Sequence, residues 1–332
     1  MPMKNLLTDV LGLRVGHADI AHVATGVTAI VFDEPAVASI AILGGAPGVR
    51  DTALLEPEMT VGAVDAILLS GGSAFGLDAA GGAMAALHEM GRGFAVGSAR
   101  VPIVPQAILF DLLNGGDKAW GRNSPYPDLG YQAVMSASDT FRLGTAGAGY
   151  GATTAMLKGG LGSASTTTAS GYTVGAIVAV NAVGSATIGD DPHFWAAPYE
   201  QNGEFGGLGW PAPFPTDALT PRLKGGPREN TVIALIATDA VLTKAECKRL
   251  ALSAHDGLAR AIRPAHTPMD GDVVFAASTG KGPLKRGVVD LTELCIAAAD
   301  TLARAIARGV YEAEALPFVG AQAVWKDRFG TP

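Results

Sequence analysis

The chain has 332 residues, of which 48% are hydrophobic and 17% charged, and glycine occupies 44 positions. This apolar content excludes an intrinsically disordered protein, because it is enough to offset the entropy lost on folding. A net charge of −7, without any block rich in lysine and arginine, argues against a nucleic-acid partner.

The predicted elements of the first part are short and apolar. Residues 27–32, 39–43 and 63–69 are predicted to be buried strands, because each is an apolar run bounded by turn residues. A helix is expected over 74–90, with Gly91 as its left-handed cap. We expect one α/β domain over residues 1–332, since α/β proteins of this size are often a single unit.

The middle of the chain is dominated by loop signals. Residues 114–128 are dense in Gly, Asn, Pro and Asp, which predicts a surface loop. The stretch 144–170 is rich in Gly, Ala, Ser and Thr and holds one charge, Lys158, before a strand expected over 172–180. Residues 190–230 form an irregular segment of roughly 40 residues, a length that indicates function or processing.

Regular secondary structure is predicted to resume at residue 231, directly after the irregular segment. Thr243 and Glu246 form a capping box, and Asp290 with Glu293 repeats the pattern at a second helix. The predicted elements are a strand at 231–238, a helix at 243–262, a strand at 273–277 and a helix at 290–308.

Compartment signals are few. The N-terminal twenty residues lack the apolar core of a signal peptide, and no run of about 18 apolar residues predicts a membrane span. The two cysteines, Cys247 and Cys295, are too few for a disulfide framework and are expected in helices. We expect a cytoplasmic protein without a membrane partner.

Common catalytic motifs are absent from the sequence. The six histidines include no HExxH pair, no CxxC occurs, and no Walker loop or dinucleotide fingerprint follows a strand, so neither a metal nor a cofactor is expected. The run from Gly71 to Gly76 misses the spacing of a hydrolase nucleophile elbow by one position.

Two features remain as candidates for chemistry. Gly71, Gly72 and Ser73 join a predicted strand to a predicted helix, where their backbone N–H groups can form an anion-binding nest or simply permit close packing. Thr231 starts a buried strand directly after the long irregular segment, and a hydroxyl residue there is by itself commonplace.

Six segments together resemble the DmpA-type aminopeptidases of peptidase family S58, and the resemblance extends over nearly the whole chain. The segments are GGAPGVRDTALL (44–55), LLSGGSAFGLDAAGG (68–82), GRGFAVG (91–97), VPIVPQAILFDL (101–112), KGGLGS (158–163) and HTPMDGDVVFAAST (266–279). The resemblance implies an αββα sandwich similar to the N-terminal nucleophile hydrolases. It also implies a precursor that cuts itself and assembles as a homotetramer.

The same resemblance places the cut between Asn230 and Thr231, which leaves an α chain of residues 1–230 and a β chain of residues 231–332. A threonine at this junction resembles the nylon-oligomer hydrolases rather than the β-aminopeptidases, whose nucleophile is serine. Once freed, the Thr231 α-amine can take the proton of its own hydroxyl, because an α-amine titrates near pH 8 and is partly neutral.

Four further residues are expected at the site, two of which match residues of the family. Asn181 corresponds to an asparagine that donates to the oxyanion, although a buried asparagine at a strand end often only satisfies backbone. Lys158 corresponds to the family's lysine and needs a carboxylate or a path to water. Asp270 and Asp272 are the expected partners of Lys158 and of the Thr231 amine, although a D-G-D sequence alone also fits an exposed turn.

The chain departs from the β-aminopeptidases at three positions. Ala155 stands where they have a tyrosine, and Asp270 and Asp272 stand where they have serine and glutamate. Tyr150 is the nearest phenol that could replace the missing one. We expect a hydrolase acting on a small peptide or amide through a Thr231 acyl-enzyme. The alternatives are an ornithine-acetyltransferase-like acyl transferase and a non-catalytic binding or assembly protein.

Overall fold

The computed structural model describes residues 3–224 and 230–330. In these ranges nine hydrogen-bonded strands form one continuous path in the order β3-β7-β4-β2-β11-β10-β9-β8, with β1 added on β2. The strands of this path are β1 (Leu13–Ile20), β2 (Thr25–Ile42), β3 (Gly48–Arg50), β4 (Val64–Ser70), β7 (Gln106–Ile108), β8 (Gly160–Thr167), β9 (Thr173–Asn181), β10 (Thr231–Val241) and β11 (Val273–Pro283). A separate hairpin joins β5 (Phe94–Val96) to β6 (Ala99–Val101).

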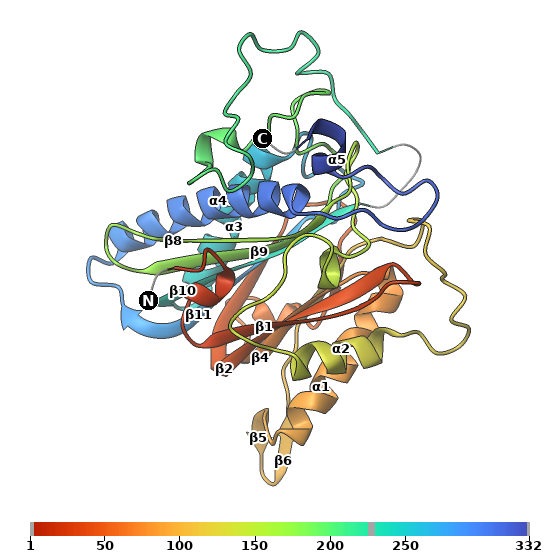
Figure 1. The fold of residues 1–332 in the computed structure, drawn as a ribbon. Coiled ribbons are helices and arrows are strands. Elements are labelled where there is room, and N and C mark those ends of the chain that lie inside the picture. Colours follow the sequence, from red (N-terminus) through yellow and green to blue (C-terminus); the bar gives the residue numbers. More distant parts are fainter. Residues whose placement is uncertain (1–2, 225–229, 331–332) are drawn as a thin grey trace.

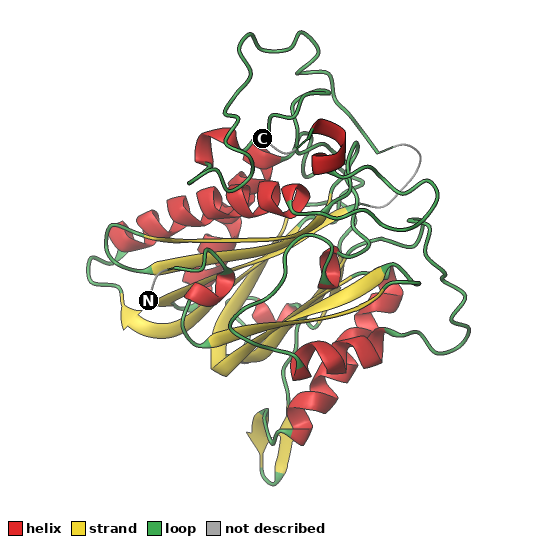
Figure 2. Ribbon diagram, in the orientation of Figure 1, coloured by secondary structure: helices red, strands yellow, loops and turns green. Residues whose placement is uncertain are grey.

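The long strand β2 divides this path into two packed sheets. Its first half pairs with β1 and β4, its second half pairs with β11, and the exposed residues 33–35 lie between the two halves. Helices cover the outer faces, as Figures 1 and 2 show. They are α1 (Ala79–Glu89) and α2 (Tyr126–Met135) on one side, α3 (Lys244–Ala261) and α4 (Val288–Tyr311) on the other, and the short α5 (Trp325–Phe329) near the C-terminus.

Three hydrophobic cores hold the four layers together. One lies between α1, α2 and their sheet, one between the two sheets, and one between the second sheet and α3, α4. Strand β10 contributes to two of them, because Ile233 and Leu235 face the opposite sheet while Val232 and Ala234 face the helices. The fold is therefore the expected αββα sandwich.

The predictions for the last third are mostly confirmed. Helix α3 begins with the predicted capping box, in which Thr243 accepts from the Glu246 backbone and the Glu246 carboxylate accepts from Thr243. Helix α4 begins at Val288, two residues before the predicted cap. Asp290 instead lies inside the first turn and accepts from the backbone N–H groups of Lys285 and Arg286.

Several predictions for the first half are wrong in detail. The strands expected at 27–32 and 39–43 are two halves of β2. The helix expected over 74–90 is a 3₁₀ helix, Ser73–Asp78, followed by α1, and Gly91 adopts the expected left-handed conformation. Helix α2 begins inside the segment expected to be a loop. The remaining described residues of the segment 190–224 are irregular apart from the 3₁₀ turn Ala197–Tyr199.

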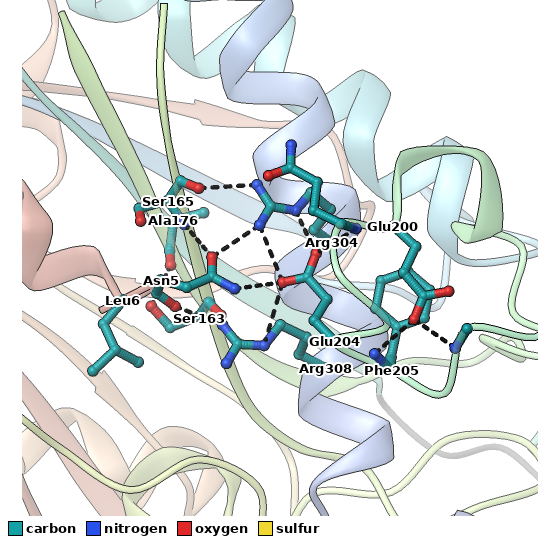
Figure 3. Close-up of polar contacts among 12 residues, drawn as sticks. Asn5, Leu6, Ser163, Ser165, Ala176, Glu200, Glu204, Phe205, Arg304 and Arg308 are labelled. Atoms are coloured by element: carbon teal, nitrogen blue, oxygen red, sulfur yellow. Dashed lines mark hydrogen bonds and ion pairs between the residues drawn. The ribbon is translucent and has the colours of Figure 1, made fainter. Parts of the chain in front are cut away.

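A buried ionic cluster attaches this irregular segment to α4 (Figure 3). The Glu204 carboxylate accepts from Arg304 Nε at 2.5 Å and from Asn5 Nδ2 at 2.6 Å, and it lies 3.6 Å from Arg308 Nε. Arg304 also donates to the Ser165 carbonyl at 2.9 Å. The side chains of Arg304 and Glu204 are almost fully buried, so each charge depends on the other for compensation.

Within the described ranges, every helix is too short or too polar to cross a lipid bilayer.

Candidate active site

The junction between residues 230 and 231 lies at the edge where three predicted segments meet. β10 begins at Thr231, which pairs in register with Asn181 at the end of the antiparallel strand β9. Asn230 forms a parallel bridge with Asp270, just before β11. Because β9 ends where β10 and β11 begin, residues that are distant in the sequence converge on one sheet edge. Thr231 is 2% exposed.

The carbonyl before Thr231 is held by the D-G-D loop. Gly271 N–H donates to the Asn230 carbonyl oxygen at 2.7 Å, which polarises the carbonyl that Thr231 would attack. A β-carbon built on Gly271 would stand 2.7 Å from Thr231 Oγ1 and 2.6 Å from the Ala46 oxygen. Only glycine therefore allows this loop to approach the threonine so closely.

The D-G-D loop is itself positioned by the backbone of residues 43–46, at the start of the GGAPG segment. Leu43 N–H donates to the Asp272 carbonyl at 3.1 Å, and Ala46 N–H donates to the Asp270 carbonyl at 2.8 Å. A β-carbon on Gly44 would stand 2.2 Å from the Asp272 nitrogen, so this contact also requires glycine. The glycines at 44 and 271 thus allow the backbone around residue 44 to pack closely against the D-G-D loop.

The two aspartates of the loop are buried and have different partners. Asp272 Oδ1 accepts from Val232 N–H at 3.0 Å, directly after the junction. Asp270 accepts from the backbone and hydroxyl of Thr267 and, at 3.3 Å, from Val183 N–H. Burial and the neighbouring charge of Asp272 raise the pKa of Asp270. The loop is therefore a buried part of the site rather than an exposed turn.

The side-chain amide of Asn181 uses only part of its hydrogen-bonding capacity within the chain. Its Oδ1 accepts from Thr153 N–H at 3.0 Å and from Lys224 Nζ at 3.1 Å, and its Nδ2 donates to the Phe110 carbonyl at 3.0 Å. A primary amide has two N–H groups, so one bond at Nδ2 leaves a second donor for an oxyanion. The acceptors and donors around Asn181 also fix which way its amide faces.

Lys158 lies at the same edge but without the partners expected from the sequence. Its Nζ donates to the carbonyls of Gly159 at 2.8 Å and Gly149 at 3.1 Å. The expected pairing with Asp270 and Asp272 is wrong, because β9 and β10 separate Lys158, which lies two residues before β8, from the D-G-D loop. Burial lowers the pKa of Lys158 to about 7, and the charge of Asp111 opposes that shift. Near neutral pH this amine can therefore gain or lose a proton.

A cavity of about 220 Å³ is lined by Phe110, Thr153 and Lys224, the three residues that hydrogen-bond to the side chain of Asn181. Its lining includes Lys158, Thr153, Lys224 and Asp111. Asp111 and Lys224 were missed in the sequence. Asp111 follows the apolar run of VPIVPQAILFDL, which is a usable signal, whereas the position of Lys224 in the irregular segment offers none. The wall of the cavity combines one carboxyl group with two amines, which suits a polar, amide-containing ligand.

The glycine turn at 71–73 does not form an open anion nest. Gly71 N–H donates to the Gly26 carbonyl, Gly72 N–H to Asp111 Oδ1 at 2.8 Å, and Ser73 N–H to the Leu109 carbonyl. These donors are occupied by the chain itself, so of the two alternatives the close-packing one is confirmed and the open nest is wrong. A β-carbon on Gly72 would stand 2.1 Å from the ring of Tyr126.

Tyr150 is not among the residues that line the cavity of Lys158. The charges that act on its phenol are those of Asp19, Arg142 and Glu314, and burial raises its pKa. The expectation that it replaces the tyrosine missing at position 155 therefore finds no support. Among the described residues, no group of three or more His, Cys, Asp or Glu side chains is arranged to hold a metal ion.

The chain is similar to known peptidases over most of its length. The family model for peptidase family S58 matches residues 5–323. An uncharacterized aminopeptidase of Mycobacterium tuberculosis is 45% identical, over 93% of this chain and 94% of the relative. The 6-aminohexanoate-oligomer endohydrolase of Kocuria sp. is 27% identical, over 83% of this chain and 75% of the relative.

A solved structure has a similar fold. The L-aminopeptidase D-Ala-esterase/amidase of Ochrobactrum anthropi, described as a variant of the Ntn hydrolase fold, superposes with a TM-score of 0.71. The match has 20% sequence identity and covers 98% of this chain and 92% of that one. At this identity the similarity concerns the fold.

Proposed function

The chain belongs to peptidase family S58, a family of hydrolases of peptide and amide bonds, and on that premise we propose that it cuts itself before Thr231 and then uses Thr231 as an N-terminal nucleophile. The observation that carries the proposal is the 2.7 Å bond from Gly271 N–H to the Asn230 carbonyl, with Thr231 Oγ1 beside the same glycine.

The cut follows from this placement of atoms. The Thr231 hydroxyl adds to the carbonyl carbon of Asn230, with the oxyanion stabilised by Gly271 N–H. The C–N bond breaks as the nitrogen takes up a proton, which leaves an ester between Asn230 and Thr231 Oγ1. Water hydrolyses the ester and gives the Asn230 carboxylate and a Thr231 with a free hydroxyl and a free α-amine.

In turnover the same residue supplies nucleophile and base. The neutral α-amine takes the hydroxyl proton as Oγ1 attacks the substrate carbonyl, and the second N–H of Asn181 donates to the oxyanion. The amine leaving group takes up a proton and departs, and water hydrolyses the Thr231 ester. Asp272 holds the backbone beside the amine, while Lys158 supplies a proton-exchanging group on the cavity side.

The proposed substrates are small peptides or amides. The relatives named aminopeptidase and 6-aminohexanoate-oligomer endohydrolase support two classes, aminoacyl amides and ω-amino-acid oligomers. A screen of aminoacyl amides, β-peptides and 6-aminohexanoate oligomers tests the proposal, with trapping of the acyl group on the fragment that starts at Thr231. Resolution of that acyl-enzyme by an added amine in preference to water would identify a transferase instead.

The pH dependence of turnover tests the role of the amine. On a neutral substrate, kcat/KM is expected to fall tenfold per unit below the amine pKa, which is about 8 before the nearby carboxylates raise it. Because burial lowers the pKa of Lys158 to about 7, the profile is also measured for Lys158→Met, in which the amine limb should persist. A flat profile from about pH 5 to 9, with chemistry rate-limiting, would exclude the amine as base.

We propose a homotetramer of processed protomers in the cytoplasm. The β5–β6 hairpin projects beyond α1 (Figure 1), and its Phe94, Val96 and Val101 are exposed, which supports a contact between copies. Both cysteines are free, which supports a reducing compartment. The Arg304–Glu204 cluster joins the two expected fragments, since Glu204 precedes the cut and Arg304 follows it.

The hairpin contact is tested by Phe94→Asp. A carboxylate in an apolar interface is costly, so light scattering after size exclusion should show the assembly falling to a smaller species. Leu11→Asp places the same charge at an exposed leucine outside the hairpin and should leave the mass unchanged. A tetrameric Phe94→Asp, or a monomeric parent, contradicts the proposal.

A further inference from the structure

The side chain of His266 hydrogen-bonds to the D-G-D loop. Its Nδ1 lies 2.9 Å from Asp272 Oδ2, and its backbone N–H donates to the same oxygen at 2.9 Å. The other oxygen of Asp272 accepts from Val232 N–H at 3.0 Å. The Asp272 carboxylate, 1% exposed, thus connects His266 to the residue after the nucleophile.

The backbone of His266 adopts an unusual conformation at this contact. Its φ is 57°, in the left-handed region that a histidine adopts only at a cost, and this conformation accompanies the two bonds to one carboxylate oxygen. Its ring packs edge to face against His255, with the ring centroids 4.9 Å apart. His255 Nε2 lies 3.0 Å from the Ala41 carbonyl, so the two imidazoles have separate partners.

The surroundings favour a protonated His266. Burial acts to lower its pKa, but the bond to Asp272, the charges of Asp272 and Asp270 and the backbone carbonyl of His255 outweigh burial, so the pKa is raised. His255 faces it from α3 and has its own pKa lowered to about 4, chiefly by burial, so that this neighbour is neutral near pH 7. The facing charges are therefore the two carboxylates.

We propose that His266 is a positioning residue for the chemistry of Thr231, acting through Asp272 on the start of β10. This rests on the proposed function. With its ring and backbone N–H both on Oδ2, His266 fixes the orientation of Asp272, and Oδ1 in turn fixes Val232 N–H and the adjacent Thr231. Displacement of Asp272 would misplace the hydroxyl and the amine together, and small misplacements of reacting groups are costly in rate.

His266 also has an electrostatic role. Two carboxylates beside a free α-amine stabilise its ammonium form and raise its pKa, which opposes its use as a base. In its protonated form, the imidazole held by Asp272 offsets part of that negative charge. Removal of the imidazole should therefore move the acid limb of the pH profile to higher pH as well as lower kcat.

The experiment compares His266→Gln, which keeps a neutral N–H donor, with His266→Ala, which keeps none. His88→Gln, at an exposed position on α1, is the matched control. For each full-length protein, intact mass gives the rate of processing and thermal unfolding reports the fold. On fully processed protein, kcat, KM and the pH profile are then measured with one neutral amide substrate.

We expect His266→Gln to process slowly and to lose about tenfold in kcat with KM nearly unchanged, and its acid limb to move up by about one pH unit. His266→Ala should lose more in kcat. If His266→Ala does not fold, the kinetics of His266→Gln alone test the proposal. A wild-type kcat and acid limb in His266→Gln, or a loss in KM alone, would overturn the assignment. Failure of the proposed function is recognised separately, by an uncut parent or an active Thr231→Ala.

Discussion

Thr231→Ala is expected to remain one chain and to lose amide hydrolysis by at least about 10³-fold. The substitution removes the hydroxyl that both attacks the Asn230 carbonyl and forms the acyl-enzyme, while β10 keeps its register and its two cores. Intact mass gives the chain state, and hydrolysis of the best substrate of the screen gives the activity.

Thr231→Ser is the matched control for this substitution. It keeps a hydroxyl at the same position and loses only a methyl group, so it should be cut at the same bond and retain measurable turnover. Efficient cutting of Thr231→Ala between residues 230 and 231, in a preparation free of contaminating protease, would show that another group performs the cleavage.

Asn181→Asp is expected to lower kcat by about 10² to 10³-fold. The aspartate has nearly the same shape and keeps an acceptor for Thr153 N–H and Lys224 Nζ, but it has no N–H for the oxyanion and places a negative charge beside it. Single-turnover measurements should show the loss in the acylation step, with a smaller change in KM.

Asn123→Asp, on the exposed loop before α2, introduces the same change in charge away from the site. It should leave kcat within about twofold. A kcat of wild-type size in folded Asn181→Asp would remove Asn181 from the oxyanion role and leave it as the buried strand-end asparagine that satisfies backbone groups.

Local signals predicted the last third of the chain well. The run of β-branched and aliphatic residues from Thr231 gives a strand buried on both faces, and the Thr243–Glu246 pair begins α3 as expected. Such signals depend on a few neighbouring residues, so they are present in the sequence. Asp290 shows their limit, because its carboxylate caps backbone groups from inside the first turn of α4.

Which residues of the site contact one another depends on the order of the strands, and local sequence patterns do not predict that order. β2 passes from one sheet to the other, so the two strands predicted at 27–32 and 39–43 are a single strand in the structure. Lys158 was expected beside Asp270, but the strand order β11-β10-β9-β8 places it on the Asn181 side. Its partners there are main-chain carbonyls, which side-chain chemistry could not predict.

His266 shows a different kind of omission. It lies within HTPMDGDVVFAAST, yet nothing in the residue pattern singles it out, because the six-residue spacing from His266 to Asp272 belongs to no known motif of paired side chains. Its role follows only from a left-handed backbone that brings ring and N–H to one oxygen of Asp272. The Gly71–Ser73 turn is the converse case, a suggestive pattern whose N–H groups the fold already uses.

The most direct test of self-cleavage before Thr231 is the intact mass of the purified full-length protein, followed over time. Self-cleavage should yield two fragments, residues 1–230 and 231–332, that remain associated under native conditions, together with activity that rises in proportion to the cut fraction. An uncut chain of 332 residues that hydrolyses amides at full rate would contradict it, because the Thr231 α-amine then remains in a peptide bond and cannot serve as the base.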